Sequence, residues 1–170
     1  GGGTTPTTPT TPTTPATQKN ITTIEKKVTD TIDSQGAIIN LENGNVQIDI
    51  PQGAFSSERT ITVKVIDHSD ISVPLPPNIK FAGPIISIDL SGEDKLNVPA
   101  TITLKYDQQL LKNIESSRLA AFYLSEDTKE WLYRGISINK ENGTASFNTS
   151  RFSTYALLLN SQNFGDIKDA

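Results

Sequence analysis

The chain contains no cysteine and no methionine, and its single histidine is His68. Without cysteine, a disulfide scaffold, a thiolate metal site and a cysteine nucleophile are all excluded. One histidine cannot complete the four ligands of a structural zinc site either. His68 stands in the sequence DHSD, but a catalytic triad depends on neighbours in space rather than in sequence. We therefore expect His68 to be a surface loop residue.

Charge and hydropathy exclude further classes of protein. The 15 lysine and arginine residues are outnumbered by 19 aspartate and glutamate residues, which gives a formal net charge of −4. Phosphate binding requires a basic stripe, so a nucleic-acid partner is not expected. No apolar run approaches the roughly 18 residues that span a bilayer, so membrane insertion is not expected. Because motifs for phosphate loops, nucleophile elbows and helix-borne metal pairs are also missing, the sequence predicts neither an enzyme nor a cofactor.

The first 18 residues form a segment of biased composition, GGGTTPTTPTTPTTPATQ. They include no large apolar side chain, so they cannot contribute to a core, and we predict an unfolded or polyproline-like linker. At about 3.1 Å per residue this linker would span roughly 50 Å. Because the chain starts with glycine rather than methionine, we interpret it as an internal piece of a longer protein.

The rest of the chain, residues 19–160, has the pattern of one β domain. Asn-Gly steps at 43–44 and 142–143 separate β-prone runs, and such steps favour tight hairpin turns. Apolar residues alternate with polar ones in runs such as VQIDI and RTITVKVI. We predict an all-β fold, an antiparallel β-sandwich of about nine strands. The only candidate helix is QQLLKNIESS, residues 108–117.

The alternation also predicts which side chains form the core. Pro84, like Pro74, Pro76 and Pro77, is not expected in a central strand, because proline cannot donate to the ladder. The predicted core consists of Ile38, Val46, Ile48, Ile50, Ile61, Val63, Val65, Ile86, Ile88, Ile102, Leu104, Phe122, Leu124, Ile136, Ile138, Phe147, Ala156 and Leu158.

One stretch carries a family resemblance. GNVQIDIPQGAF, residues 44–55, resembles the signature of the ZU-type domain shared by ankyrins, zonula occludens proteins and netrin receptors. Later segments of that family are similar to VPATITLKYD, EWLYRGISI and RFSTYALLL in this chain. In the signature Pro51 ends a strand, Gly53 permits a turn and Phe55 returns to the core. The resemblance implies a ZU-like β-sandwich over residues 19–160.

The two ends of the chain resemble parts of bacterial surface proteins. The stretch TTPTTPTTPTTPAT resembles the Thr-Pro linkers of scaffoldin and anchoring proteins from cellulose-degrading clostridia. NFGDIKDA, within residues 161–170, resembles the opening of an S-layer homology module, with Phe164, Asp166, Ile167 and Ala170 near its frame. These resemblances imply an extracellular protein of a bacterial cell surface.

In that setting the domain would be a non-catalytic spacer. It would hold an upstream partner-binding module, a cohesin if the cellulosome resemblance holds, away from the cell wall. Its partners would be the neighbouring modules of the parent protein, with cell-wall polysaccharide as a further candidate. The implied organisation is a linker over 1–18, the sandwich over 19–160, and a joint with a truncated S-layer homology module over 161–170.

Self-cleavage is one alternative that the resemblance raises. Some ZU-type domains cleave themselves before the serine of a His-Phe-Ser step, which requires a nucleophile and a group that accepts its proton. Here the step reads Arg151-Phe152-Ser153. Arginine cannot act as a general base at neutral pH, so we expect Phe152 to pack the last strand and Ser153 to satisfy a turn.

Carbohydrate binding is a second alternative. Trp131, Tyr133 and Tyr123 could stack on sugar rings if they were exposed in a row, and the first two share a face of one strand. The structural interpretation is that the single tryptophan fills the core or caps its edge. An exposed aromatic row would favour sugar binding, whereas a buried Trp131 would favour the spacer.

Calcium binding is a third alternative. The sequences SGEDKLN, LSEDTKE and NKENG place carboxylate and amide oxygens in loops, and calcium prefers oxygen ligands. None of the three has the spacing of an EF-hand loop, and acidic turns are ordinarily just solvated.

Overall fold

The computed structural model describes residues 18–93, 95–112 and 116–160. Twelve strands form two six-stranded sheets. Sheet A has the order β1-β3-β4-β7-β11-β10, and sheet B has the order β2-β5-β6-β12-β8-β9. The strands are β1 (Lys19–Thr22), β2 (Lys27–Ile32), β3 (Ala37–Leu41), β4 (Val46–Ile50), β5 (Arg59–Ile66), β6 (Ile79–Leu90), β7 (Lys95–Lys105), β8 (Leu119–Ser125), β9 (Glu130–Arg134), β10 (Ser137–Asn139), β11 (Thr144–Arg151) and β12 (Thr154–Asn160).

The predicted all-β sandwich is confirmed, with three corrections. The described residues contain twelve strands rather than about nine, and β1 pairs with β3 in parallel rather than antiparallel. The described part of the predicted helix over 108–117 contains turns and the start of the 3-10 turn η3 (Ser116–Arg118), and residues 113–115 lie outside the described residues. The predicted linker, apart from Gln18, and the predicted module start over 161–170 also lie outside them.

Both Asn-Gly turns are confirmed. The β3–β4 connection is the 3-10 turn η1 (Glu42–Gly44), where Asn43 has φ 56° and Gly44 has φ 88°. The β10–β11 connection places Gly143 at φ 67°. Asparagine and glycine tolerate these left-handed conformations better than other residues, so the turns fix the two hairpin registers.

The main core lies between the two sheets, but the predicted core residues were wrong in strands β3 and β8, and in β12 as described below. In β3 the residues facing the core are Ala37, Ile39 and Leu41, not Ile38. In β8 the predicted core residues Phe122 and Leu124 are only half-buried. Consecutive apolar residues in these strands carry no period-two signal, so the register could not be read from the sequence. Val65, Ile136 and Ile138 are half-buried and pack against the main core from its margin.

A second apolar cluster covers the outer face of sheet B, and we call it the outer cluster. It contains the predicted core residues Ala156 and Leu158, which are fully buried there rather than in the main core. All seven residues of β12 are buried, because apolar groups cover this central strand on both faces. The remaining members are Ile85 and Ala120, with Ile66, Ile71, Leu75, Ile79, Phe81, Phe122 and Trp131 packed against them.

Pro84 lies in the central strand β6, which corrects the prediction. The pairing of β12 with β6 jumps from Ala156–Ile85 to Leu158–Phe81, so the β6 strand bulges at this point. On the other side, the pairing of β5 with β6 ends at Ile85. The missing N–H of Pro84 therefore falls where the ladder is already interrupted, which is where a strand tolerates proline.

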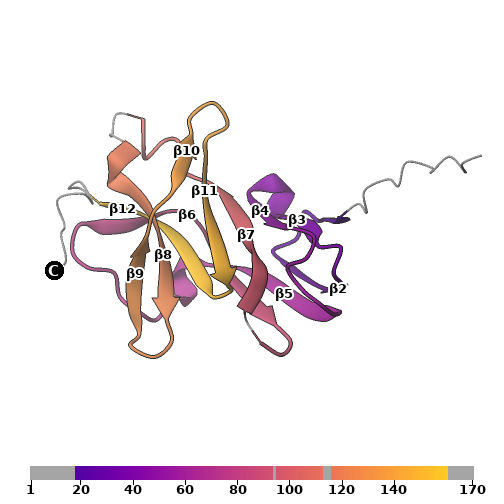
Figure 1. Ribbon diagram of the computed structural model, residues 1–170. Coiled ribbons are helices and arrows are strands. Elements are labelled where there is room, and N and C mark those ends of the chain that lie inside the picture. Colours follow the sequence, from indigo (N-terminus) through magenta and orange to yellow (C-terminus); the bar gives the residue numbers. More distant parts are fainter. Residues whose placement is uncertain (1–17, 94, 113–115, 161–170) are drawn as a thin grey trace, which may run out of the picture.

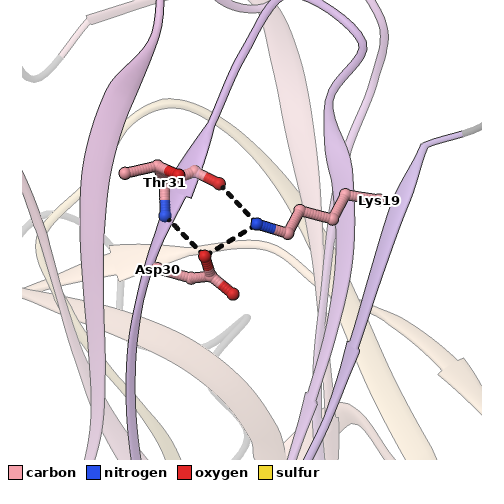
Figure 2. Close-up of polar contacts among 3 residues, drawn as sticks. All are labelled: Lys19, Asp30 and Thr31. Atoms are coloured by element: carbon pink, nitrogen blue, oxygen red, sulfur yellow. Dashed lines mark hydrogen bonds and ion pairs between the residues drawn. The ribbon is translucent and has the colours of Figure 1, made fainter.

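The first open side of the sandwich, where β1 and β2 lie, is closed by a lysine. Lys19 Nζ lies 2.7 Å from Asp30 Oδ1 and donates to the Thr31 carbonyl oxygen at 3.2 Å (Figure 2). The Thr31 N–H donates to Asp30 Oδ1 at 2.8 Å. This clip joins sheet A to sheet B and occupies polar backbone groups of the edge strand β2, which limits its pairing with another chain.

The opposite side is closed by an arginine. Arg134, at the end of β9 in sheet B, donates a hydrogen bond to the carbonyl oxygen of Asn148 in β11 of sheet A. Its guanidinium also lies over the Phe147 ring, 6.0 Å from the centroid. Because β10 pairs only with residues 144–146 of β11, Arg134 covers the edge where that pairing stops.

The two ends of the folded part lie on opposite sides of the molecule. The chain enters through β1 beside β3 and leaves at the end of β12 (Figure 1). At the entrance, the Gln18 side-chain amide donates to Asp49 Oδ1 at 2.6 Å and to the Ile50 carbonyl oxygen at 2.7 Å. Gln18 therefore belongs to the folded part.

Candidate functional site

The outer face of β9 presents two of the predicted aromatic residues. Trp131 lies opposite Leu124 and Tyr133 lies opposite Phe122 in the β8–β9 ladder, so the two aromatics share a face. Trp131 is half-buried and packs edge-on against Phe81, with 6.1 Å between ring centroids. Tyr133 is 61% exposed and packs edge-on against Phe122 at 5.7 Å.

Tyr123, the third predicted aromatic, lies on the other face of sheet B. It stands opposite Leu132 in the ladder and packs against the main core. The structure therefore forms no row of three aromatic residues. Trp131 is neither deep in the main core nor part of such a row, since it packs at the margin of the outer cluster.

Tyr123 instead lines a pocket that also contains the Arg151-Phe152-Ser153 step. This pocket, which we call the Tyr123 pocket, has a volume of about 470 Å³. It lies between the turn that joins β8 to β9 and the connection from β11 to β12. Tyr123, a candidate for sugar stacking, and the Arg151-Phe152-Ser153 step, a candidate for self-cleavage, thus line the same pocket. Its lining residues are Tyr123, Leu124, Ser125, Glu126, Asp127, Arg134, Thr149, Arg151, Phe152, Ser153 and Tyr155.

The rear wall of the pocket is a closed network of hydroxyl groups. The carbonyl oxygen of Arg151 accepts hydrogen bonds from the Tyr155 hydroxyl and, at 2.5 Å, from Thr149 Oγ1. The two hydroxyl oxygens are 3.0 Å apart. Burial raises the pKa of Tyr155 to about 12, so this phenol is neutral at any ordinary pH. The network fixes the chain where β11 is irregular, between Thr149 and Arg151.

Phe152 has the packing role expected of it, whereas the Ser153 hydroxyl bonds to strand β8 rather than within a turn. Phe152 is buried in the main core with 4% of its surface exposed. Ser153 Oγ donates to the carbonyl oxygen of Leu124 at 3.2 Å. The chain's one histidine lines a different pocket, so no imidazole accompanies Ser153 among the lining residues.

His68 is exposed in a 3-10 turn, η2 (His68–Asp70), as expected of a surface residue. Its Nε2 lies 3.0 Å from the Gly83 carbonyl oxygen, and its ring centroid lies 4.7 Å from that of Phe81. It borders a pocket of about 680 Å³ at one end of the sandwich, where Lys26 and Asp67 form an ion pair at 3.2 Å. These contacts give His68 a structural role.

The described parts of the three acidic loops form no shared cluster, and Asp94 of the first loop lies outside the described residues. Over the described ranges, no group of three or more histidine, aspartate or glutamate side chains is placed to hold a metal ion. The same residues include no helix that is long and apolar enough to span a membrane.

Sequence reasoning missed Arg134, which lines the Tyr123 pocket, because nothing in its immediate sequence distinguishes it. Asp127 was singled out only as part of the candidate calcium loop LSEDTKE, and its place beside Tyr123 and Ser153 was not foreseen. They reach the pocket because β8, β9, β11 and β12 bring residues about 25 positions apart together, a placement that depends on the registers of four strands.

Comparison with known proteins adds the family context. The model of the ZU5 domain family matches residues 28–119, more than half of the chain. The chain is also 25% identical over 156 residues, 89% of its length, to an amylopullulanase from Thermoanaerobacterium thermosulfurigenes. It spans only 8% of the length of that relative.

Proposed function

The chain belongs to the ZU5 domain family, and from this premise we propose that it is a non-catalytic structural module of a bacterial cell-surface anchoring protein. In this role it holds an upstream partner-binding module away from the cell wall. The resemblance of the Thr-Pro stretch to scaffoldin linkers points to a cohesin as that module. The S-layer-like residues 161–170 point to wall-binding repeats on the other side.

The observation that carries the proposal is the position of the two chain ends. The chain enters at β1 and leaves at β12 on opposite sides of the sandwich (Figure 1), so the module adds its own length to the parent protein. The Lys19 clip and Arg134 join the two sheets on both open sides, which suits a compact spacer. The similarity to a small part of a much longer protein supports a module carried by a larger chain.

The absence of catalysis is supported by the surroundings of Ser153. Its hydroxyl donates to the carbonyl oxygen of Leu124, and Arg151 occupies the sequence position at which the self-cleaving step has histidine. The test is the intact mass of the purified 170-residue chain after prolonged incubation at neutral pH. We expect one unchanged mass; two fragments that begin and end at the Phe152–Ser153 bond would contradict the proposal.

The proposed location is tested in the source organism. An antibody raised against residues 19–160 should label intact, unpermeabilised cells, and the parent protein should fractionate with the cell envelope. Labelling that appears only after the cells are permeabilised would rule out a surface module.

A further inference from the structure

We propose that the Tyr123 pocket binds a neutral oligosaccharide. This inference is independent of the spacer role, because a structural module serves as a spacer whether or not it also holds a glycan. It differs from stacking on the outer face of β9, since the pocket lies on the opposite side of that strand pair.

The pocket has a suitable size and position. Ligand sites for small molecules typically have volumes of about 300–1,000 Å³, and the Tyr123 pocket has about 470 Å³. Its floor and walls come from strand ends and from the two connections between them, and such connections often carry binding residues. Half-buried Tyr123 contributes the ring surface against which a sugar ring could pack.

The polar groups of the pocket divide into two sets. The hydroxyls of Thr149, Ser153 and Tyr155 are all satisfied by the protein. By contrast, the Arg151 guanidinium and the Asp127 carboxylate make no hydrogen bond or ion pair with any described residue, and both side chains belong to exposed residues. The satisfied groups form a fixed wall, and the unpaired ones are available to a ligand.

The charges of the lining favour a neutral ligand over a polyanion. The lining holds Arg134 and Arg151 together with Glu126 and Asp127, and Glu126 also pairs with Lys129 at 3.1 Å, so the site has no large surplus of positive charge. A polyanion would require a surplus of positive charge. A sugar hydroxyl both donates and accepts hydrogen bonds, so it can use a guanidinium and a carboxylate in the same site.

The site is also held in place before any ligand arrives. The Arg151 main chain is fixed by two hydroxyl donors, and Arg134 is fixed by its hydrogen bond to the Asn148 carbonyl oxygen and by the Phe147 ring. Preorganisation of this kind lowers the ordering cost of binding. These contacts hold the Arg134 side chain and the Arg151 main chain in place, so binding has to order only the Arg151 side chain.

The experiment is an NMR titration of the isotope-labelled 170-residue chain. The probes are maltoheptaose, cellohexaose and xylohexaose, with oligogalacturonate as a charged probe. We expect saturable shift changes with at least one neutral probe, confined to the amides of residues 123–129, 134 and 149–153. No saturable change with any neutral probe, or saturable binding of oligogalacturonate alone, would overturn the proposal.

Variants identify the site. Arg151→Ala and Asp127→Ala should each weaken binding of the responsive neutral probe about tenfold, because each removes a charged hydrogen-bond partner. Lys64→Ala and Asp89→Ala, matched in charge and exposed on other strands, should leave the affinity unchanged. Well-dispersed spectra of all four variants would confirm that they fold.

The same titration separates the pocket from the outer face. Unchanged affinity in both pocket variants would overturn the proposal, and so would shift changes centred on Trp131 and Tyr133 with loss of binding in Tyr133→Ala. Either result would leave the spacer role standing, because that role is tested by location and display rather than by glycan binding.

Discussion

At the scale of single residues, the hydroxyl network behind the Tyr123 pocket has the clearest energetic consequences. Tyr155 is 2% exposed, so its phenol cannot exchange a lost protein partner for bulk water. An intramolecular hydrogen bond contributes about 0.5–1.5 kcal/mol to stability. Tyr155 supplies one of the two hydrogen bonds that the Arg151 carbonyl accepts and also contacts the Thr149 hydroxyl, so removing its hydroxyl loses two interactions while the Thr149 bond to Arg151 remains.

We therefore predict that Tyr155→Phe lowers the free energy of unfolding by about 1–2 kcal/mol, measured by urea denaturation. Tyr106→Phe is the matched control, because no described residue hydrogen-bonds the hydroxyl of half-buried Tyr106. Its effect should stay within about 0.5 kcal/mol. Equal stabilities of the two variants would show that the network contributes nothing.

The raised pKa of Tyr155 also predicts a pH dependence. A tyrosine whose pKa rises from 10.0 to about 12 on folding stabilises the fold fully below pH 10, and that contribution is lost as pH rises through 12. The urea concentration at the unfolding midpoint of the native chain should therefore decrease as pH is raised from 10 to 12. The midpoint of Tyr155→Phe should decrease less steeply over the same range. Parallel pH profiles of the two proteins would contradict this assignment.

At the scale of elements, turns were easier to predict than strand registers. The Asn-Gly turns and the alternating strands β4, β5 and β7 follow from local sequence, because each residue type there has a conformational or burial reason. The registers of β3, β8 and β12 do not, because their apolar residues are consecutive. β1 and β2 were not predicted at all, since KNIT and KVTDTI contain few apolar residues.

Two glycines in turns test how far local geometry determines stability. Gly36 and Gly53 have positive φ angles of 79° and 88°. A Cβ at Gly36 would lie 2.2 Å from the Ile50 carbonyl oxygen, whereas a Cβ at Gly53 would meet only Val98 at 3.7 Å. We predict that Gly53→Ala costs about 1–2 kcal/mol of backbone strain.

Gly36→Ala should cost clearly more, because the Ile50 main chain must also move. Thermal and urea unfolding of the two alanine variants measure the difference. If Gly36→Ala were as stable as Gly53→Ala, the close approach of Gly36 to the Ile50 main chain would be contradicted.

The Lys19 clip is an element-scale device whose thermodynamic effect is small. The hydrogen bond from Lys19 holds the pKa of Asp30 below its usual 3.8, so the stability it provides is present above that pH and is lost as pH falls through the lowered pKa. Both side chains are substantially exposed, so solvent and salt screen the pair and Asp30→Asn should cost no more than about 1 kcal/mol.

The clip's larger effect should be on the edge strand. With Asp30 replaced by asparagine, the Lys19 contact weakens and β2 becomes more open to pairing. We expect faster association of Asp30→Asn than of the native chain in concentrated solution, measured by light scattering. Glu126→Gln, which breaks an exposed ion pair away from any edge of β2, should associate no faster.

At the scale of the whole molecule, the side chains of Lys19 and Arg134 and the position of the chain ends all suit a compact spacer. Lys19 and Arg134 each reach from one sheet to a backbone carbonyl of the other, on opposite sides of the sandwich. The Tyr123 pocket lies next to the Arg134 side. None of this could be predicted from the sequence, because each contact joins segments whose proximity depends on the complete topology.

The spacer role is tested most directly by replacing residues 19–160 of the parent protein with a short flexible linker. If the module provides distance from the wall and the upstream module is the proposed cohesin, intact cells should then capture less of a dockerin-bearing protein, while the purified parent protein should bind it as before. An unrelated β-sandwich of similar length in the same position should restore capture. Equal capture by cells with and without the module would contradict the account.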